Sequence, residues 1–349
     1  MSHMYEKMVT PREGLRLHLN ENTGGCSPAV LEAMRALSAE DAACYPDYTD
    51  AIAACADYLA LPPERVLLTN GLDEGILAAC IAGLKGSTPE APLDAIVIVP
   101  AFDMFASSAE GVGGRVIEVP MDEDFGFPLD AVRNAITPAT RLVFITDPNN
   151  PTGLSVPADA IFTIAAAAPH AIIFVDEAYA DIRGRTTIGD PRLEQYPNVV
   201  IGRTFAKAQG LAAIRVGALT GHEATLQRIR RVVPPYSINI AAAVALPAAL
   251  RDRAHIARYV SESRESKERL YGALDRLEIT YWRSDANFVL ARIGARAGEL
   301  TAALRERGIY IRDRSRAPLC AGCVRITTGM VEHTERAIAA IEEVLCAVR

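Results

Sequence analysis

Short apolar runs recur between residues 65 and 221, and the segments that separate them have the apolar spacing of helices. The runs are apolar on both faces, whereas a strand with one face in water alternates apolar and polar residues. This pattern is typical of a mostly parallel sheet covered by helices on both sides, so it predicts an α/β fold. The expected strands cover residues 66–68, 95–99, 116–119, 142–145, 172–175, 199–201 and 216–219.

The pattern changes after residue 235. Helical periodicity over residues 239–277 leads into a strand-like run at 288–291, then a helix, further strands and a last helix that ends near Val348. This order predicts a second, smaller α+β domain, which the N-terminal residues are expected to join. The expected division is a large domain of residues 28–238 and a small domain of residues 1–27 and 239–349.

Composition and charge narrow the class of protein. The 349 residues suffice for about two domains, and no apolar run reaches the ~18 residues of a membrane-spanning helix, so we expect no membrane partner. With 36 basic and 43 acidic side chains the net charge is -7, which argues against nucleic acid as a partner.

The cysteines indicate a reduced, cytoplasmic protein. They number seven, an odd count without a disulfide framework, and no apolar targeting segment precedes them. Cys320 and Cys323 have the spacing of a metal or redox pair, but no second pair or nearby histidine completes four ligands. We therefore expect two structural thiols and no metal.

Lysine is scarce, with only Lys7, Lys85, Lys207 and Lys267 in the chain. Lys207 follows the strand at 199–201 among small and hydroxyl residues, whereas the other three stand in contexts expected to be exposed. A buried ammonium near another cation has a lowered pKa, and the free amine attacks a carbonyl to form an imine. The alternative for Lys207 is an ordinary salt-bridged lysine.

Three other polar features follow predicted strands, where ligands gather in such sheets. Asp176 comes directly after the strand at 172–175 and needs a cation, either a protein arginine or a protonated ring nitrogen of a cofactor. The turn at residues 71–75 leads into a helix expected from near Ile76 and suits a phosphate, although an ordinary capped helix has the same pattern. The loop at 146–153 presents the neutral amide of Asn150, whose bond to the following proline is a candidate for the cis form.

Together these groups are the ones that pyridoxal 5'-phosphate requires: a lysine for an imine, a carboxylate for the ring nitrogen, an amide donor and a turn that binds phosphate. Phe102, which follows another strand, is placed to stack on the ring, and core packing is the alternative for this side chain.

The sequence resembles the fold-type I pyridoxal phosphate aminotransferases, and within them the histidinol-phosphate aminotransferases. The resemblance implies a large domain with a seven-stranded sheet and a smaller α+β domain. It runs from about residue 17 to the C-terminus, and its most specific segments are residues 18–22, 45–46, 71–75, 147–153, 176–179, 203–215, 234–239, 287 and 325–327.

By this resemblance, Lys207 holds the cofactor aldehyde and Asp176 pairs with the ring nitrogen. Asn150 and Tyr179 contact the phenolic oxygen of the ring, and Asn150 also borders the substrate. Tyr179 and Asp176 are thereby counted with Lys207 as catalytic residues.

The resemblance also assigns the two anionic ends of the ligands. The cofactor phosphate is expected on the backbone of Leu72 and Asp73, with Thr204, Arg215 and, from a second subunit of a homodimer, Tyr45. For the substrate, Arg325 is expected to bind a carboxylate through two parallel hydrogen bonds, with a domain-interface ion pair as the alternative. By the same resemblance, Arg312 and Tyr236 bind the phosphate of the substrate, and Asn20 and Glu21 border the substrate.

Two of these assignments have alternatives from the residues alone. In the alternative interpretation, Arg312 pairs with a neighbouring acidic residue. For Asn20 and Glu21, the alternative role is to cap the helix that follows Pro28.

Three departures from the family are also visible. Ala206 replaces a hydroxyl residue before the lysine, Phe102 replaces a tyrosine, and the N-terminal arm is short with an altered stretch at 23–26.

The implied reaction moves an amino group between glutamate and 2-oxoglutarate on one side and histidinol phosphate and imidazole acetol phosphate on the other, in histidine biosynthesis. One alternative is an aminotransferase of the same group for aromatic or other amino acids, and another is a lyase similar to threonine-phosphate decarboxylase. A nicotinamide-dependent dehydrogenase is disfavoured because G-x-G-x-x-G is absent from the sequence.

Overall fold

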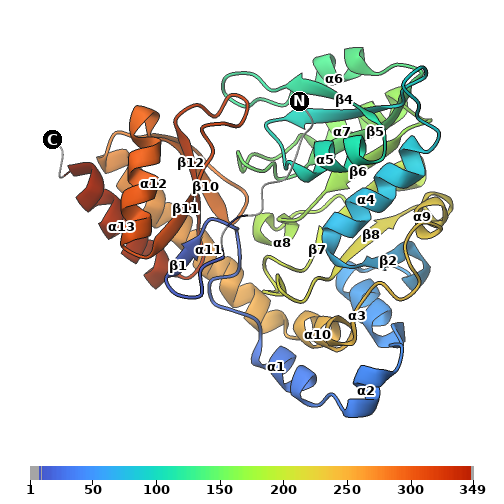
Figure 1. Ribbon diagram of the computed structural model, residues 1–349, viewed down its shortest axis with the longest axis horizontal. Helices are drawn as coiled ribbons and strands as arrows, with labels where there is room; N and C mark the ends of the chain where they lie inside the picture. Colours follow the sequence, from blue (N-terminus) through green and yellow to red (C-terminus); the bar gives the residue numbers. More distant parts are fainter. Residues whose placement is uncertain (1–7, 9, 347–349) are drawn as a thin grey trace.

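The computed structural model describes residues 8 and 10–346 and contains two sheets, each with its own helices (Figure 1). The larger sheet has seven strands in the order β2-β8-β7-β6-β5-β3-β4. All seven predicted strands are confirmed. They are β2 (Val66–Thr69), β3 (Asp94–Val99), β4 (Arg115–Pro120), β5 (Thr140–Thr146), β6 (Ile172–Asp176), β7 (Val199–Thr204) and β8 (Gly217–Gly221).

The larger sheet is mostly parallel, as predicted. Strands β3 to β7 pair in parallel, and β8 runs antiparallel to both β2 and β7. Successive residues of β6 enter different apolar cores, because Ile172 and Phe174 pack on one face while Ile173 and Val175 pack on the other. Both faces are therefore buried, which explains the continuous apolar runs in the sequence.

Helices cover both faces of this sheet (Figure 1). Helix α4 is almost entirely buried where it crosses the sheet, and α3 and α10 pack against each other. The helices before and within this part of the chain are α1 (Pro28–Arg35), α2 (Ala39–Ala43), α3 (Thr49–Leu59), α4 (Gly71–Leu84), α5 (Met104–Gly111), α6 (Leu129–Ala135), α7 (Ala158–Ala167), α8 (Ala180–Arg183) and α9 (Glu223–Arg230), with short 3-10 turns at Pro63–Arg65 and Pro191–Glu194.

The smaller sheet has five strands in the order β1-β11-β12-β10-β9. Its first strand comes from the N-terminal part of the chain and pairs in parallel with β11, with Leu15 opposite Ile309. The other pairs are antiparallel. The elements are β1 (Leu15–Leu17), α10 (Ile240–Arg251), α11 (Arg253–Arg276), β9 (Thr280–Trp282), β10 (Phe288–Arg292), a 3-10 turn at Gly294–Arg296, α12 (Ala297–Glu306), β11 (Ile309–Asp313), β12 (Cys323–Thr327) and α13 (Val331–Cys346).

The division of the strands into two sheets agrees with two domains. The domain boundary expected between residues 238 and 239 stays a prediction. Helix α10, which follows that boundary, contributes Ala242, Ala245 and Leu246 to a core that it shares with the larger sheet. The last helix was expected to end near Val348, and it is described as far as Cys346.

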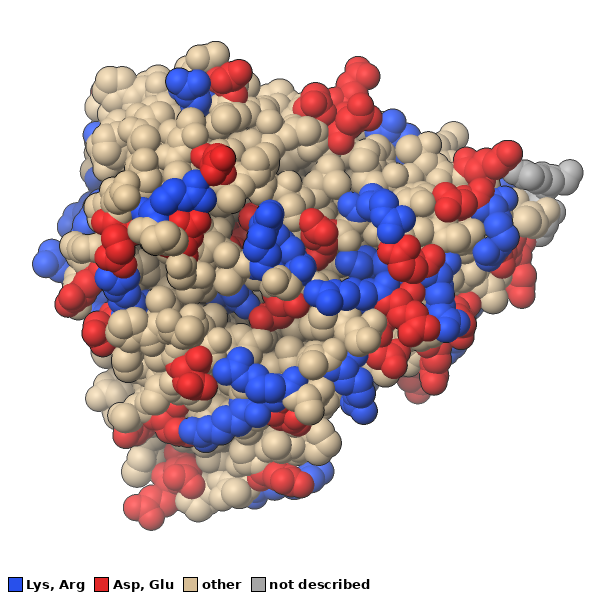
Figure 2. Space-filling view, turned by 180° about the vertical axis from the view of Figure 1, so that it is seen from behind, with Lys and Arg blue, Asp and Glu red and all other residues tan. Residues whose placement is uncertain are grey.

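Three findings bear on the expectations about membrane, cysteines and charge. No helix of the described residues is long and apolar enough to cross a membrane. All seven cysteines have free thiols, and burial raises the pKa of Cys320 to about 12. Acidic and basic side chains are interspersed on the face shown in Figure 2, without a continuous basic surface there.

Candidate active site

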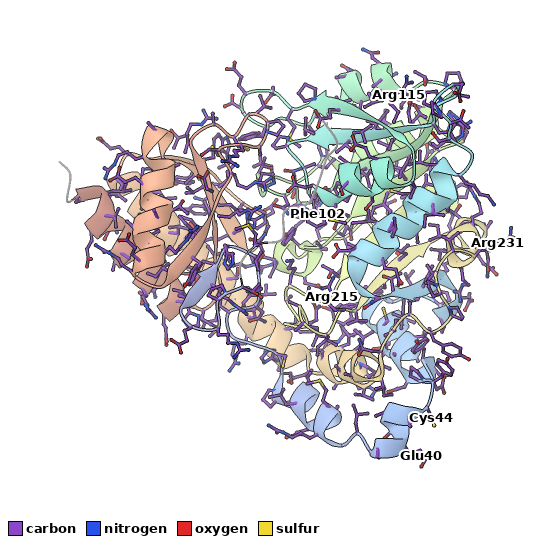
Figure 3. All side chains as sticks on the ribbon, viewed as in Figure 1. Glu40, Cys44, Phe102, Arg115, Arg215 and Arg231 are labelled. Carbon is purple, nitrogen blue, oxygen red and sulfur yellow. The ribbon has the colours of Figure 1, made fainter. Side chains whose placement is uncertain are left out.

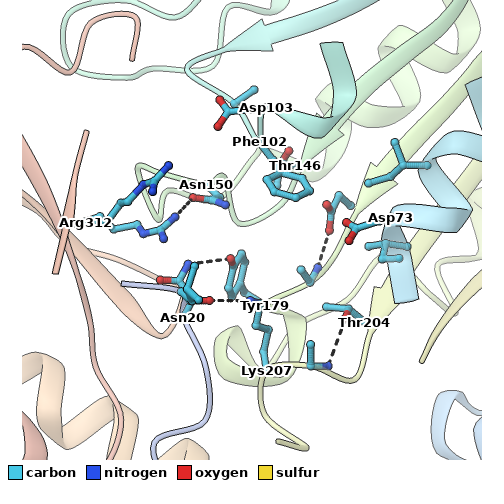
Figure 4. A pocket seen from close by; sticks show the side chains of 18 of the residues that line it. Asn20, Asp73, Phe102, Asp103, Thr146, Asn150, Tyr179, Thr204, Lys207 and Arg312 are labelled. Atoms are coloured by element: carbon cyan, nitrogen blue, oxygen red, sulfur yellow. Dashed lines mark hydrogen bonds between the residues drawn. The ribbon is translucent and has the colours of Figure 1, made fainter. Parts of the chain in front are cut away.

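A cavity of about 210 Å³ lies at the carboxyl edge of the larger sheet and is bounded by the smaller sheet on its other side. Parallel strands bring their carboxyl ends to one edge, so β5, β6 and β7 deliver their following loops to the same place. Most of the predicted site residues meet here (Figure 4). They are Asn20, Leu72, Asp73, Phe102, Asn150, Asp176, Tyr179, Thr204, Lys207, Arg215, Arg312 and Arg325.

Lys207 lies in the turn after β7, and its side chain reaches into the cavity (Figure 4). Its Nζ donates a hydrogen bond to the Leu19 carbonyl oxygen at 3.1 Å. Burial, reinforced by the positive charge of Arg325, lowers the pKa of Lys207 to about 8. An appreciable fraction of this amine is therefore uncharged near neutral pH, the form that attacks a carbonyl.

Asp176 ends β6 and is 4% exposed. Its carboxylate accepts a hydrogen bond from the Ala178 backbone N–H at 2.9 Å, and no arginine among the described residues pairs with it. Burial raises the pKa of Asp176 to about 7, with the neighbouring charge of Asp73 acting in the same direction. The alternative partner, a protein arginine, is therefore not found among the described residues. The carboxylate suits a protonated ring nitrogen instead.

The turn before α4 differs from the sequence prediction in one respect. The helix begins at Gly71 and not near Ile76, because the acidic residues after the glycine form its first turn instead of a loop. Asn70 makes no side-chain cap, which leaves the first amides of the helix available to an anion. Gly71 has φ +71, and a Cβ there would lie 2.5 Å from Nη2 of Arg215.

Arg215 closes this end of the cavity together with Asp73. Its Nη2 donates to the Asp73 carboxylate at 3.0 Å, and its Nη1 donates to the Ala212 carbonyl at 2.9 Å. The residue itself has a left-handed φ of +61. Thr204 lies nearby in the same cavity lining. A hydroxyl, a guanidinium and the helix N-terminus thus form a donor set suited to phosphate oxygens.

The smaller sheet contributes Arg325, which is 6% exposed. Its Nη1 donates to Oδ1 of Asn150 at 2.5 Å, and its Nη2 donates to the His18 carbonyl at 2.7 Å. The Asn150–Pro151 bond is cis, as predicted, and Asp147–Pro148 and Val99–Pro100 are also cis. Phe102 lines the opposite side of the cavity (Figure 4).

Asn20 joins the N-terminal segment to the ring-binding side chains. It has a left-handed φ of +55, and its Nδ2 donates to the Tyr179 hydroxyl oxygen at 2.9 Å. The alternative in which Asn20 and Glu21 cap the helix after Pro28 is wrong, because the Ser27 side chain accepts the hydrogen bond from the first turn of α1. Glu21 pairs with Arg16 at 3.2 Å and does not line the cavity.

Tyr45 and Tyr236 also lie outside this cavity lining. Their rings stack on each other with centroids 4.2 Å apart, and the two residues are 78% and 56% exposed. Within a single chain neither ring lines the cavity, so both roles stay predictions.

Sequence reasoning missed several residues of the cavity. Arg314 lines it with a side chain that is 10% exposed, 3.7 Å from the Asp103 carboxylate. Arg314 follows the last residue of β11, and no local pattern in the sequence indicates that its side chain lines the cavity. The other unpredicted lining residues are His18, Leu19, Ile76, Ala101, Asp103, Thr146, Ala178 and Ala206.

The expectation that Lys267 is exposed is wrong. Lys267 is 7% exposed and its Nζ donates to the Ser284 carbonyl oxygen at 2.6 Å. It lies on the face of α11 that also buries Ser263, Leu270 and Tyr271, at helical spacing from each of them. Lys85 is exposed as expected, and Lys7 lies outside the described residues.

Comparisons with known proteins agree with this geometry. The sequence profile of class I and II aminotransferases matches residues 12–341. Histidinol-phosphate aminotransferase of Haloarcula marismortui is 35% identical over 97% of this chain and 91% of its own length, and the enzyme of Halalkalibacterium halodurans is 33% identical over 95% and 89%.

Solved structures agree as well. Histidinol-phosphate aminotransferase from Sinorhizobium meliloti, in complex with pyridoxal-5'-phosphate, has a TM-score of 0.86 at 26% identity and covers 99% of this chain and 96% of its own. L-threonine-O-3-phosphate decarboxylase from Porphyromonas gingivalis shares the fold, with a TM-score of 0.80 at 20% identity over 95% and 99% of the two chains.

Proposed function

The chain belongs to the class I and II aminotransferases, which depend on pyridoxal 5'-phosphate, and we propose that it exchanges an amino group between glutamate and imidazole acetol phosphate. The products are 2-oxoglutarate and histidinol phosphate, and the reaction also runs in reverse. The names of relatives with more than 30% identity support this choice of substrates.

The observation that carries the choice is the pairing of two arginines in one cavity. Arg312 on β11 lies directly opposite Arg325 on β12, and both line the site. Both guanidinium groups can therefore donate hydrogen bonds to an anion that is bound in the cavity. A phosphate with two negative charges suits two such donors better than a neutral or aromatic side chain does.

The chain's own residues have separate roles in this proposal. Bound pyridoxal phosphate supplies an electron sink for the bond that breaks at the substrate carbon. Lys207 Nζ holds the cofactor and carries the proton to and from that carbon. Asp176 keeps the ring nitrogen protonated, while Tyr179 and Asn150 orient the phenolic oxygen of the ring.

The cofactor phosphate is assigned to Leu72 and Asp73 at the start of α4, together with Thr204 and Arg215. We propose that Tyr45 of the partner subunit in a homodimer completes this set. The exposed stack of Tyr45 on Tyr236 supports the proposal, because large aromatic surfaces that remain open to water on one chain are typical of an interface. The cytoplasmic location and the absence of a nucleic-acid partner stay predictions.

The test is a substrate panel of histidinol phosphate, phenylalanine, aspartate and phosphothreonine with the purified holoenzyme. We expect histidinol phosphate to have the highest kcat/KM and to require stoichiometric 2-oxoglutarate. The Arg312→Ala variant should lose about 10²-fold in kcat/KM for histidinol phosphate and much less for phenylalanine, because one charge-assisted hydrogen bond to the phosphate is removed.

Arg231→Ala is the matched control, since Arg231 is exposed at the end of α9 and lies far from the cavity (Figure 3). Equal rates for phosphorylated and unphosphorylated substrates, or an Arg312→Ala variant that preserves the preference, would reject histidinol phosphate. Release of carbon dioxide from phosphothreonine without a 2-oxo acid would favour the lyase alternative.

A further inference from the structure

A second cavity, of about 550 Å³, lies between α8, α11 and the turn that precedes β10. It shares no lining residue with the active-site cavity. Helix α8 separates the two, because Tyr179 at its N-terminal end lines the first cavity while Arg183 at its C-terminal end lines the second. The transamination chemistry uses nothing in this second cavity.

Two cations of the second cavity have only neutral partners. Lys267 Nζ, which has three protons to donate, makes one hydrogen bond, to the Ser284 carbonyl oxygen at 2.6 Å. Arg264 donates from Nε and Nη2 to a single acceptor, the Ile182 carbonyl oxygen, at 3.3 and 3.0 Å. Several N–H groups of these two side chains therefore have no acceptor among the described residues.

The carboxylates around the cavity are engaged elsewhere. Glu268 pairs with Arg283, Asp285 accepts a hydrogen bond from the Ser155 hydroxyl, and Glu265 pairs with an arginine one turn further along α11. Arg183, the remaining cation of the cavity, pairs with Asp147. Neither the buried Lys267 nor the exposed Arg264 therefore forms an ion pair among the described residues.

Burial without a counter-ion is costly for an ammonium group. Burial lowers the pKa of Lys267 to about 8, although the negative charge of Asp285 acts in the opposite direction, and the positive charge of Arg264 acts in the same direction as burial. A lysine that is buried on one face of a helix without an ion pair fits a site at which a bound ligand supplies the negative charge.

We propose that this second cavity binds a small oxyanion, with the Lys267 ammonium and the Arg264 guanidinium as its principal ligands. A phosphate or a carboxylate group meets the requirement, because both offer several acceptor oxygens to a guanidinium and an ammonium. The site is independent of the substrate proposed above, since none of its residues lines the active-site cavity.

The experiment measures the acetylation rate of each lysine in the holoenzyme by peptide mass spectrometry, with inorganic phosphate as the probe. For a dissociation constant of about 1 mM, 10 mM phosphate leaves about a tenth of the sites free, so Lys267 should react about tenfold more slowly. Exposed Lys85 in the same sample is the internal control, and sodium chloride at equal ionic strength controls for screening.

A parallel titration with glutarate separates a phosphate site from a carboxylate site, according to which anion protects Lys267 at the lower concentration. Protection should disappear in Arg264→Gln, return in part in Arg264→Lys, and persist in Arg231→Gln. The proposal is overturned if neither anion protects Lys267, if chloride protects it equally, or if Arg264→Gln is protected like the wild type. The wild-type comparison decides the matter even if the Arg264 variants fail to fold.

Discussion

Lys207 and Lys267 have the same titration behaviour in different surroundings. Burial lowers the pKa of each to about 8. Around Lys207 lie a buried carboxylate, an aromatic ring and a helix N-terminus at the edge of a parallel sheet, whereas Lys267 meets a carbonyl oxygen and a guanidinium in the middle of a long helix. Both cavities therefore contain an amine with a lowered pKa. The groups that could orient a cofactor lie only around Lys207, and they distinguish the catalytic lysine.

The largest expected difference between the two cavities is in covalent chemistry. Lys207→Ala removes the amine that holds the cofactor and moves the proton, so transamination should fall by about 10⁴-fold. Lys267→Met should keep wild-type turnover. Borohydride reduction followed by peptide mapping should place the trapped cofactor on Lys207, and an adduct on Lys85 or Lys267 would contradict the assignment.

A smaller effect is expected from Asp176, the buried carboxylate of the first cavity. Asp176→Asn keeps the size of the side chain and removes its charge, so the ring nitrogen loses its counter-ion and kcat should fall by about 10² to 10³-fold. The measurement is single-turnover kinetics of the half-reaction with glutamate. Asp285→Asn, at the second cavity, is the matched control and should leave that rate unchanged.

The pH dependence of stability reports on Lys267 in the holoenzyme, where the cofactor occupies Lys207. The pKa of Lys267 falls from 10.5 to about 8 on folding, so the unfolded chain binds more protons between these values. Stability should therefore rise with pH, by on the order of 1 kcal/mol from about pH 7 to about pH 9. Urea unfolding of the wild type and Lys267→Met at both pH values measures the difference, and an equal pH dependence of the two proteins would show that folding does not lower the pKa of Lys267.

The smallest expected effect concerns the phosphate end of the first cavity. Ala206 lines it beside Thr204, where relatives by resemblance have a hydroxyl residue. Ala206→Ser should add one hydrogen bond of about 1 kcal/mol and tighten pyridoxal phosphate binding about fivefold. Equilibrium dialysis of the apoenzyme tests this, with Ala206→Val as the variant that adds bulk without a donor. Unchanged affinity in Ala206→Ser would place the phosphate elsewhere.

Much of the first cavity was predictable because its residues follow strands. Asp176, Asn150 and Lys207 each come after an apolar run, and the parallel order of those runs brings their carboxyl ends together. Local sequence alone is enough to expect such a cluster. The residue types suggested an imine, a partner for the ring nitrogen and an amide donor, and the resemblance then assigned these roles to the family's site.

The second cavity was not predictable in this way. Lys267 is buried because it lies on one face of α11 and contacts the turn at Ser284. No local pattern in the sequence predicts this contact. The same holds for Arg314, whose approach to Asp103 joins the two sheets. Helix α4 begins earlier than expected because the acidic residues after Gly71 form its first turn, although Gly71 itself has the left-handed φ that is common in turns.

The edge strand β1 has a consequence for when activity first becomes possible. Its neighbour in the sheet is β11, and the residues that follow it place the His18 carbonyl against Arg325 and the Leu19 carbonyl against Lys207. The ribosome synthesises β1 long before β11. A nascent chain therefore carries its reactive lysine before these contacts can orient it, and catalysis waits until β11 and β12 have been made.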